Sequence, residues 1–133
     1  WIVLSAINDS GFSVSGYFPV MSEYKVNPHI RKKESLEMDL VLICEKKIKN
    51  NDPTQSDEVI IKKITTKLHL THIKNKNELF LHYVGELMII ASSVWNINKV
   101  TYAWFEEMLS NFDKLFSNFF NKEDGRIFPE ILN

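Results

Sequence analysis

The feature that most constrains this sequence is a stripe of large apolar residues near its C-terminal end. Between Thr101 and about Phe120, these residues recur three and four positions apart, the spacing that keeps side chains on one face of an α-helix. The stripe comprises Phe105, Met108, Leu109, Phe112, Leu115, Phe116, Phe119 and Phe120. A helix with such a face packs into a hydrophobic core in most proteins.

Two further helices are predicted before it. Ser56 is a suitable N-cap, followed by two acidic residues, for a helix that reaches about His72. The next helix, from residue 77 or 78 to about 96, is apolar nearly all round and is expected to be the central one. Polar residues and a glycine interrupt its apolar stretch, which fits a buried helix better than a membrane span. The interruptions are His82, Gly85, Glu86 and Asn96.

The first third of the chain has the pattern helix, strand, loop, strand. A short helix over Trp1–Ser10 is expected to end at Gly11, because glycine suits the position after a helix. The segment Phe12–Val20 alternates and predicts a strand. Its expected faces are Phe12, Val14 and Gly16 on one side and Ser13, Ser15 and Tyr17 on the other.

A polar, basic loop is predicted over residues 21–37, and a second strand over Met38–Cys44. The second strand is nearly all apolar, so we expect it to be covered on both faces and Cys44 to be a buried free thiol. The two strands should pair antiparallel. Two strands and a short helix cannot bury a core alone, so they must complete a larger sheet or lean on the helices.

The order of residues in this first third resembles a known family. The matching residues are Trp1, Ala6-Ile7, Ser10-Gly11-Phe12-Ser13-Val14, Phe18-Pro19-Val20-Met21-Ser22-Glu23 and Asp39-Leu40-Val41-Leu42-Ile43-Cys44-Glu45-Lys46-Lys47. They resemble the last part of prokaryotic AdoMet-dependent adenine-N6/cytosine-N4 DNA methyltransferases, closest to the adenine-specific DNA methylase group. In those enzymes a helix ending in Gly-Phe leads into the sixth strand, and a Pro-Val-x-Ser-Glu-like turn leads to an antiparallel seventh strand.

The resemblance implies an α/β fold. Residues 1–50 would form the C-terminal edge of a Rossmann-like methyltransferase sheet, a helix plus an antiparallel strand pair, and residues 51–133 a three-helix α region. The family's Gly-rich AdoMet loop and its Asp/Asn-Pro-Pro-Tyr/Phe motif do not occur in the 133 residues. We therefore expect a fragment that is inactive alone and holds no catalytic residue, with those motifs upstream of Trp1. S-adenosyl-L-methionine would be the cofactor of the parent enzyme. Its partners would be DNA and the remainder of the methyltransferase domain.

An enzyme that methylates a base amino group must extrude that base from the duplex and hold it. In this family an aromatic residue after the sixth strand, commonly followed by proline, stacks on the base. Phe18, which precedes Pro19, is therefore the first stacking candidate and Tyr17 the second. The alternative is that Phe18 is a core residue at the end of a strand.

Basic residues in the predicted loop are candidates for contacts with DNA phosphates, with a solvated charged loop as the alternative. They are Lys25, Arg31, Lys32 and Lys33. Ser22 and Glu23 are candidates for bracing the loop. No Cys or His set has metal-ligand spacing, so no metal is expected.

The alternative function is a non-enzymatic module that contacts a partner protein or DNA. Its aromatic helix would bind a partner protein or a second copy of the chain. In a methyltransferase fragment, the same face would instead dock on the missing catalytic body. The residues given contain no secretory signal and a single cysteine, so we expect a cytoplasmic protein with no membrane partner. The resemblance implies that the protein is prokaryotic. The resemblance leaves open the target base, the recognition sequence and any paired restriction activity.

Overall fold

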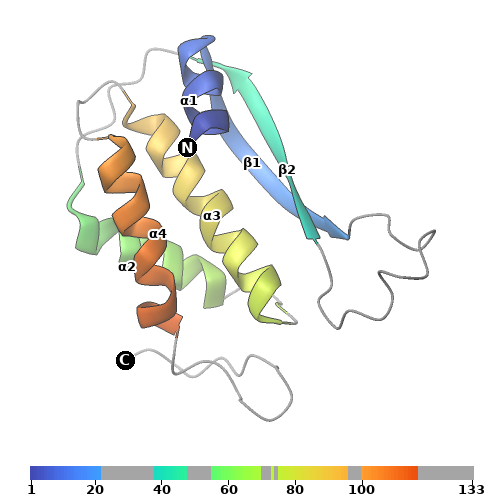
Figure 1. Cartoon of the computed structure of the whole chain (residues 1–133), viewed down its shortest axis with the longest axis vertical. Coiled ribbons are helices and arrows are strands. Elements are labelled where there is room, and N and C mark those ends of the chain that lie inside the picture. Colours follow the sequence, from blue (N-terminus) through green and yellow to red (C-terminus); the bar gives the residue numbers. More distant parts are fainter. Residues whose placement is uncertain (22–37, 48–54, 70–72, 74, 96–99, 117–133) are drawn as a thin grey trace.

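A computed structural model describes residues 1–21, 38–47, 55–69, 73, 75–95 and 100–116. The chain is α/β, as the sequence predicts, with four helices and a two-stranded antiparallel sheet in this described part (Figure 1). The elements in order are α1 (Ile2–Asp9), β1 (Phe12–Met21), β2 (Met38–Lys46), α2 (Asp57–His69), α3 (Lys76–Ser93) and α4 (Tyr102–Phe116). The antiparallel pairing of the two predicted strands is confirmed.

The helix boundaries follow from local capping. Gly11 adopts a φ of 87° directly after α1, the left-handed conformation that glycine tolerates best. Ser56 caps α2 as predicted, since its Oγ accepts a hydrogen bond from the N–H of Val59 at 3.4 Å. α3 begins slightly before the predicted residue because Asn75 is its N-cap, with Oδ1 accepting from the N–H of Glu78 at 2.9 Å. The predicted ends of the three longer helices, near residues 72, 96 and 120, lie outside the described residues.

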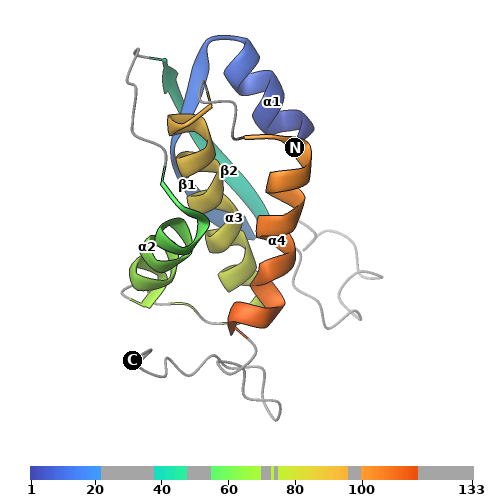
Figure 2. The ribbon, with the colours of Figure 1, turned by 90° about the vertical axis from the view of Figure 1, so that its left-hand side faces the viewer.

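The molecule is layered around α3. The sheet lies on one side of this helix and α2 and α4 lie on the other, as Figure 2 shows, so the predicted central position of α3 is confirmed. Tyr83 is fully buried in α3 and its hydroxyl donates to the backbone oxygen of Met108 in α4 at 2.6 Å. The indole N–H of Trp104 in α4 donates to Asp57 in α2 at 3.0 Å. Hydrogen bonds thus supplement apolar packing between the helices.

The aromatic stripe of α4 is part of the hydrophobic core. Phe105, Met108, Phe112 and Phe116 are buried, and the rings of Phe112 and Phe116 lie 5.2 Å apart. The residues of the first third join the same core, because Leu4 of α1 and Val14 of β1 belong to it. The strand pair therefore leans on the helices, which is one of the two solutions expected for it.

A β-bulge in β1 changes which side chains face the core. Val14 pairs with Cys44 and Gly16 with Ile43, so Ser15 is an extra residue in β1. The bulge turns Tyr17 onto the inner face with Val14, and the predicted placement of these two on opposite faces is wrong. The strict alternation used for the prediction fails because a bulge inserts one residue and shifts the pattern by one.

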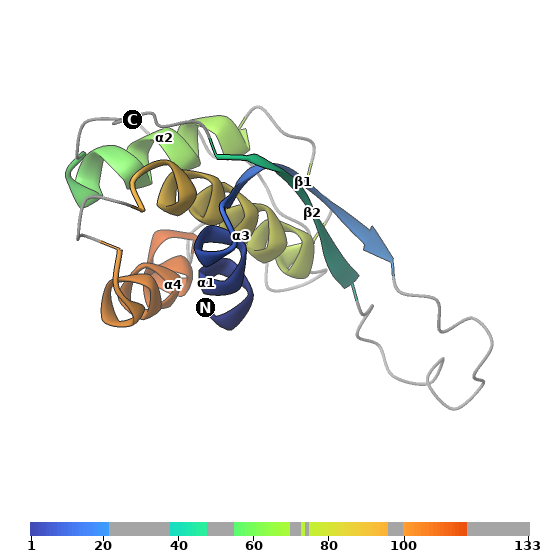
Figure 3. The ribbon, with the colours of Figure 1, turned by 90° about the horizontal axis from the view of Figure 1, so that it is seen from above.

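The outer face of the sheet is open in the described part of the chain. α1 and α3 pack on the inner face, and no described helix covers the other (Figure 3). Apolar side chains of Phe18, Val41 and Ile43 are exposed there. The prediction that β2 is covered on both faces is therefore wrong for the part of the chain that the structure describes. Cys44 is likewise exposed rather than buried, because α3 packs mainly on β1 and leaves the end of β2 in contact with solvent.

Candidate functional site

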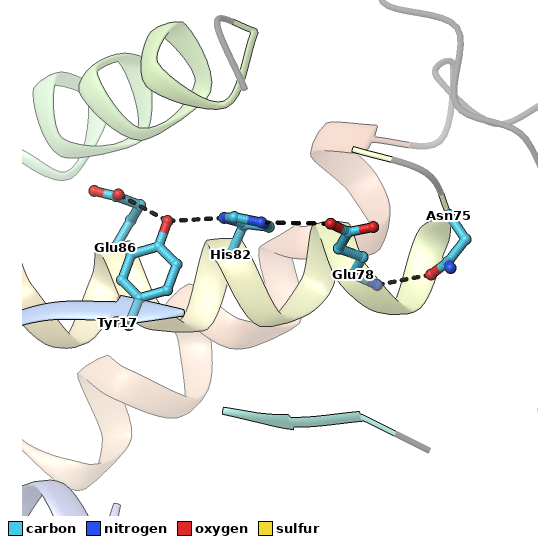
Figure 4. Close-up of polar contacts among 5 residues, drawn as sticks. All are labelled: Tyr17, Asn75, Glu78, His82 and Glu86. Carbon is cyan, nitrogen blue, oxygen red and sulfur yellow. Dashed lines mark hydrogen bonds and ion pairs between the residues drawn. The ribbon is translucent and has the colours of Figure 1, made fainter. Parts of the chain in front are cut away.

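Tyr17 joins the sheet to α3 through a polar cluster that lies between them. Its hydroxyl donates to Oε1 of Glu86 at 2.8 Å, and the oxygen of this hydroxyl lies 3.1 Å from Nδ1 of His82 (Figure 4). The Tyr17 ring packs against α3 at Gly85, where a Cβ atom would lie only 2.4 Å from the ring. The residues of the cluster come from β1 and from consecutive turns of α3.

Glu86 is a carboxylate held almost out of solvent, with 7% of its side chain exposed. Burying a charge is costly unless it is paired, and Lys67 of α2 provides the pair with Nζ 2.7 Å from Oε1. Burial, followed by the hydrogen bond and charge of Glu86, raises the pKa of Tyr17 well above its usual range. The Tyr17 hydroxyl is therefore neutral near pH 7 and donates its proton to the Glu86 carboxylate.

His82 occupies the other side of the Tyr17 hydroxyl. Because the tyrosine proton goes to Glu86, the network assigns the hydrogen to Nδ1 of a neutral His82, which donates to the Tyr17 oxygen. Nε2 lies 3.9 Å from Oε1 of Glu78, the next carboxylate along α3. Burial lowers the pKa of His82, and the two glutamates oppose this shift without overcoming it.

This cluster connects elements rather than presenting a reactive group. The hydroxyl of Tyr17, the carboxylate of Glu86 and Nδ1 of His82 direct their hydrogen bonds toward one another. Within the described ranges, no group of three or more His, Cys, Asp and Glu is arranged to hold a metal ion. In that same part of the chain, no helix combines the length and the apolar character needed to cross a bilayer.

The structure separates the two stacking candidates. Phe18 follows Tyr17 in β1 and lies on the outer face, where it is 47% exposed and pairs in register with Val41 of β2. Tyr17 points the opposite way, into the polar cluster. β1 ends at Met21, so Phe18 lies near the start of the segment that carries the predicted phosphate-contacting residues. Those candidates, Lys25, Arg31, Lys32 and Lys33, and the bracing candidates Ser22 and Glu23, lie outside the described residues.

Sequence reasoning missed the partners of Tyr17. Gly85 and Glu86 are a glycine and a carboxylate inside an apolar helix. Their presence in the sequence indicated only that this helix does not span a membrane. A glycine in a helix interior costs about 0.5–1 kcal/mol relative to alanine, so its presence signals a close approach of another group. Nothing in the sequence indicates that this group is the Tyr17 ring, because the contact depends on the bulge.

No family model, curated protein or solved structure matches this chain. The functional interpretation therefore depends on the resemblance of residues 1–47 and on the geometry of β1 and its neighbours.

Proposed function

We propose that this chain is the C-terminal part of a prokaryotic cytoplasmic DNA amino-methyltransferase that transfers a methyl group from AdoMet to a base amino group. In this proposal α1, β1 and β2 form the edge of its Rossmann-like sheet. The observation that carries the proposal is the exposed aromatic ring of Phe18, close to the end of a strand that follows a helix and a left-handed glycine. The order helix, glycine, strand and antiparallel strand is the order that the resemblance implies.

The open outer face of the sheet supports a larger parent domain. Phe18, Val41 and Ile43 expose apolar surface on one side of strands whose other side is already covered. Strands that are apolar on both faces are typical of sheets with a layer on each side. Under this proposal the remainder of the methyltransferase domain would cover Val41 and Ile43 and leave the ring of Phe18 open to the base. It would also hold AdoMet, which supplies the methyl group.

The role of this chain in the reaction would be to hold the extruded base. An aromatic face binds any base by stacking, which contributes about 1–3 kcal/mol per base. Phe18 is suited to this role because its ring is half-exposed. It lies within β1, before the strand ends at Met21, whereas the resemblance implies an aromatic residue after the strand. The basic residues at positions 25 and 31–33 would contact the flanking phosphates.

The test has two parts, the reading frame and cofactor binding. We expect the polypeptide encoded before Trp1 to contain the Gly-rich loop and an Asp/Asn-Pro-Pro-Tyr/Phe motif. The longer protein should bind AdoMet in a calorimetric titration and transfer labelled methyl groups to DNA, whereas residues 1–133 alone should do neither. An upstream sequence without both motifs, or micromolar AdoMet binding by the 133 residues, would overturn the proposal.

The non-enzymatic alternative was suggested by the aromatic stripe of α4, which would have to be free to bind a partner. The described part of the aromatic stripe is occupied within the core, where Phe112 and Phe116 are buried against Tyr83. A docking function by this helix would need the face that already packs on α3. We therefore rank the enzyme fragment first.

A further inference from the structure

We propose that Tyr17 and Glu86 are positioning residues that hold Phe18 on the outer face of the sheet, ready to stack on an extruded base. The inference rests on the proposed function and adds to it a set of residues that touch neither base nor cofactor. Three features of the structure support it: a bulge held by a hydrogen bond, a close approach to a glycine and an ion pair with a buried carboxylate.

The bulge in β1 is pinned by a buried hydroxyl. Oγ of Ser92 in α3 accepts a hydrogen bond from the backbone N–H of Val14 at 3.1 Å. Nδ2 of Asn8 lies 3.4 Å from the same oxygen. The backbone N–H of Val14, next to the bulge, thereby has a hydrogen-bond acceptor. This bond stabilises the register shift that turns Tyr17 inward.

The direction of Tyr17 is then fixed at both ends of its side chain. The ring lies over Gly85, where no other residue would leave room for it. The hydroxyl is bound to Glu86, which is in turn paired with Lys67 on α2. A rotation of the strand at Tyr17 would break the hydroxyl contacts and leave the buried Glu86 without one of its hydrogen-bond partners, which is unfavourable.

Neighbouring side chains in a strand point to opposite faces, so fixing Tyr17 inward fixes Phe18 outward. A ring held in its binding direction before the base arrives loses less conformational freedom on stacking. The cluster would therefore act on the base only through the backbone of β1. Removing it should affect the reaction without removing any group that touches DNA.

The experiment compares two tyrosines in the longer methyltransferase. Tyr17→Phe deletes the half-buried hydroxyl that is proposed to hold Phe18 in place, and Tyr83→Phe deletes a fully buried hydroxyl that binds Met108 of α4, away from β1. The melting temperature of both variants should be lower than that of the wild type. Only Tyr17→Phe should lower kcat on a matched duplex, by roughly tenfold, since small misplacements of a binding group have effects of this order or larger. A duplex with the target base mismatched should restore part of the loss, because extrusion is then easier.

Glu86 provides a second pair of variants. Glu86→Gln keeps an acceptor for the Tyr17 hydroxyl and should retain most of the activity, whereas Glu86→Leu removes the acceptor and should resemble Tyr17→Phe. A readout that does not need activity is fluorine NMR of residues 1–133 labelled with 4-fluorophenylalanine, with the Phe18 signal assigned by Phe18→Leu. Tyr17→Phe should shift or broaden that signal, and Tyr83→Phe should leave it in place.

The outcomes separate the two proposals. If Phe18→Ala leaves methylation unchanged, stacking by Phe18 is wrong and the positioning inference is wrong with it. If Phe18→Ala abolishes methylation while Tyr17→Phe and Tyr83→Phe have equal effects on kcat, the proposed function stands and the positioning inference is overturned. An unmoved Phe18 signal in Tyr17→Phe also overturns it.

Discussion

The ring of Tyr17 lies so close to the backbone of Gly85 that a Cβ atom at position 85 would fall 2.4 Å from its Cγ. Real Cβ atoms essentially never approach other atoms this closely, so the tyrosine ring must move if a larger residue replaces the glycine. The two residues thus set the distance between the sheet and α3. The hydrogen bonds of the Tyr17 hydroxyl depend on that distance.

We expect Gly85→Ala to lower the free energy of unfolding by about 1–2 kcal/mol. Overpacking typically costs about 1–3 kcal/mol, and the intrinsic helix preference for alanine, about 0.5–1 kcal/mol, offsets part of it. Urea denaturation followed by circular dichroism measures the change. Gly16→Ala is the control, because its Cβ would lie 3.3 Å from the end of the flexible Ile43 side chain. A stabilising Gly85→Ala in the wild-type background would contradict the close approach.

Lys67→Met should destabilise the protein more than Lys76→Met. Lys67 pairs with the buried Glu86, whereas Lys76 pairs at 3.2 Å with Asp113, whose side chain is 79% exposed. We expect a loss of about 1–2 kcal/mol for Lys67→Met, less than for a fully buried pair because its own end is exposed. Exposed pairs such as that of Lys76 contribute about 0–1 kcal/mol. Equal unfolding midpoints for the two variants in urea would show that the ion pair of Glu86 with Lys67 adds no more stability than an exposed pair.

His82 should make the stability depend on pH below its ordinary pKa of 6.5. Burial lowers the pKa of His82 in the folded protein, so the unfolded chain takes up a proton first as the pH falls. The contribution of neutral His82 to the free energy of unfolding is fully present above pH 6.5. It is lost as the pH falls toward the lower pKa of His82 in the folded protein. His82→Gln should flatten this part of the curve between pH 7.5 and about 5. Parallel curves for the variant and the wild type would assign the dependence to other groups.

Phe18→Ala should have a small effect on stability in residues 1–133. Phe18 is half-exposed on the outer face, so we expect a loss of about 1 kcal/mol, below the range for full burial of such a side chain. Phe112→Ala, in the core, should cost about 3–5 kcal/mol. Thermal melts of the two variants measure the difference. A loss in Phe18→Ala as large as that in Phe112→Ala would favour the core role that competes with base stacking.

Cys44 should react with a thiol-specific disulfide reagent in the folded protein. The side chain is exposed at the end of β2, so one equivalent should react without denaturant. Urea should not increase the final amount, and Cys44→Ser should abolish the reaction. If Cys44 reacts only in urea, its side chain is buried in the folded protein, as the apolar residues around it in the sequence predicted.

Local patterns predicted the elements, and long-range contacts decided the site. The helices and strands were predictable because their periodicity, caps and the Gly11 stop are contained within short segments. The direction of Tyr17 was not, because it depends on a one-residue bulge and on a hydroxyl from Ser92, far away in the sequence. The contacts of Tyr17 with Gly85 and Glu86, and of Glu86 with Lys67, were not predictable for the same reason. They form only when folding brings α2 and α3 to β1. The exposure of Cys44 was missed because an apolar strand does not reveal which of its ends a helix reaches.

The fit of Tyr17 on Gly85 also restricts the order in which this sequence can change over time. While position 17 carries an aromatic ring, any side chain at position 85 forces that ring to move and costs stability. Once a smaller residue replaces Tyr17, alanine at 85 becomes favourable, and Tyr17→Ala should reverse the sign of the Gly85→Ala effect in a double-mutant cycle. Relatives of this chain should therefore change the two positions together, with the tyrosine lost first. Such paired change in an alignment would indicate which proteins keep the same spacing between strand and helix.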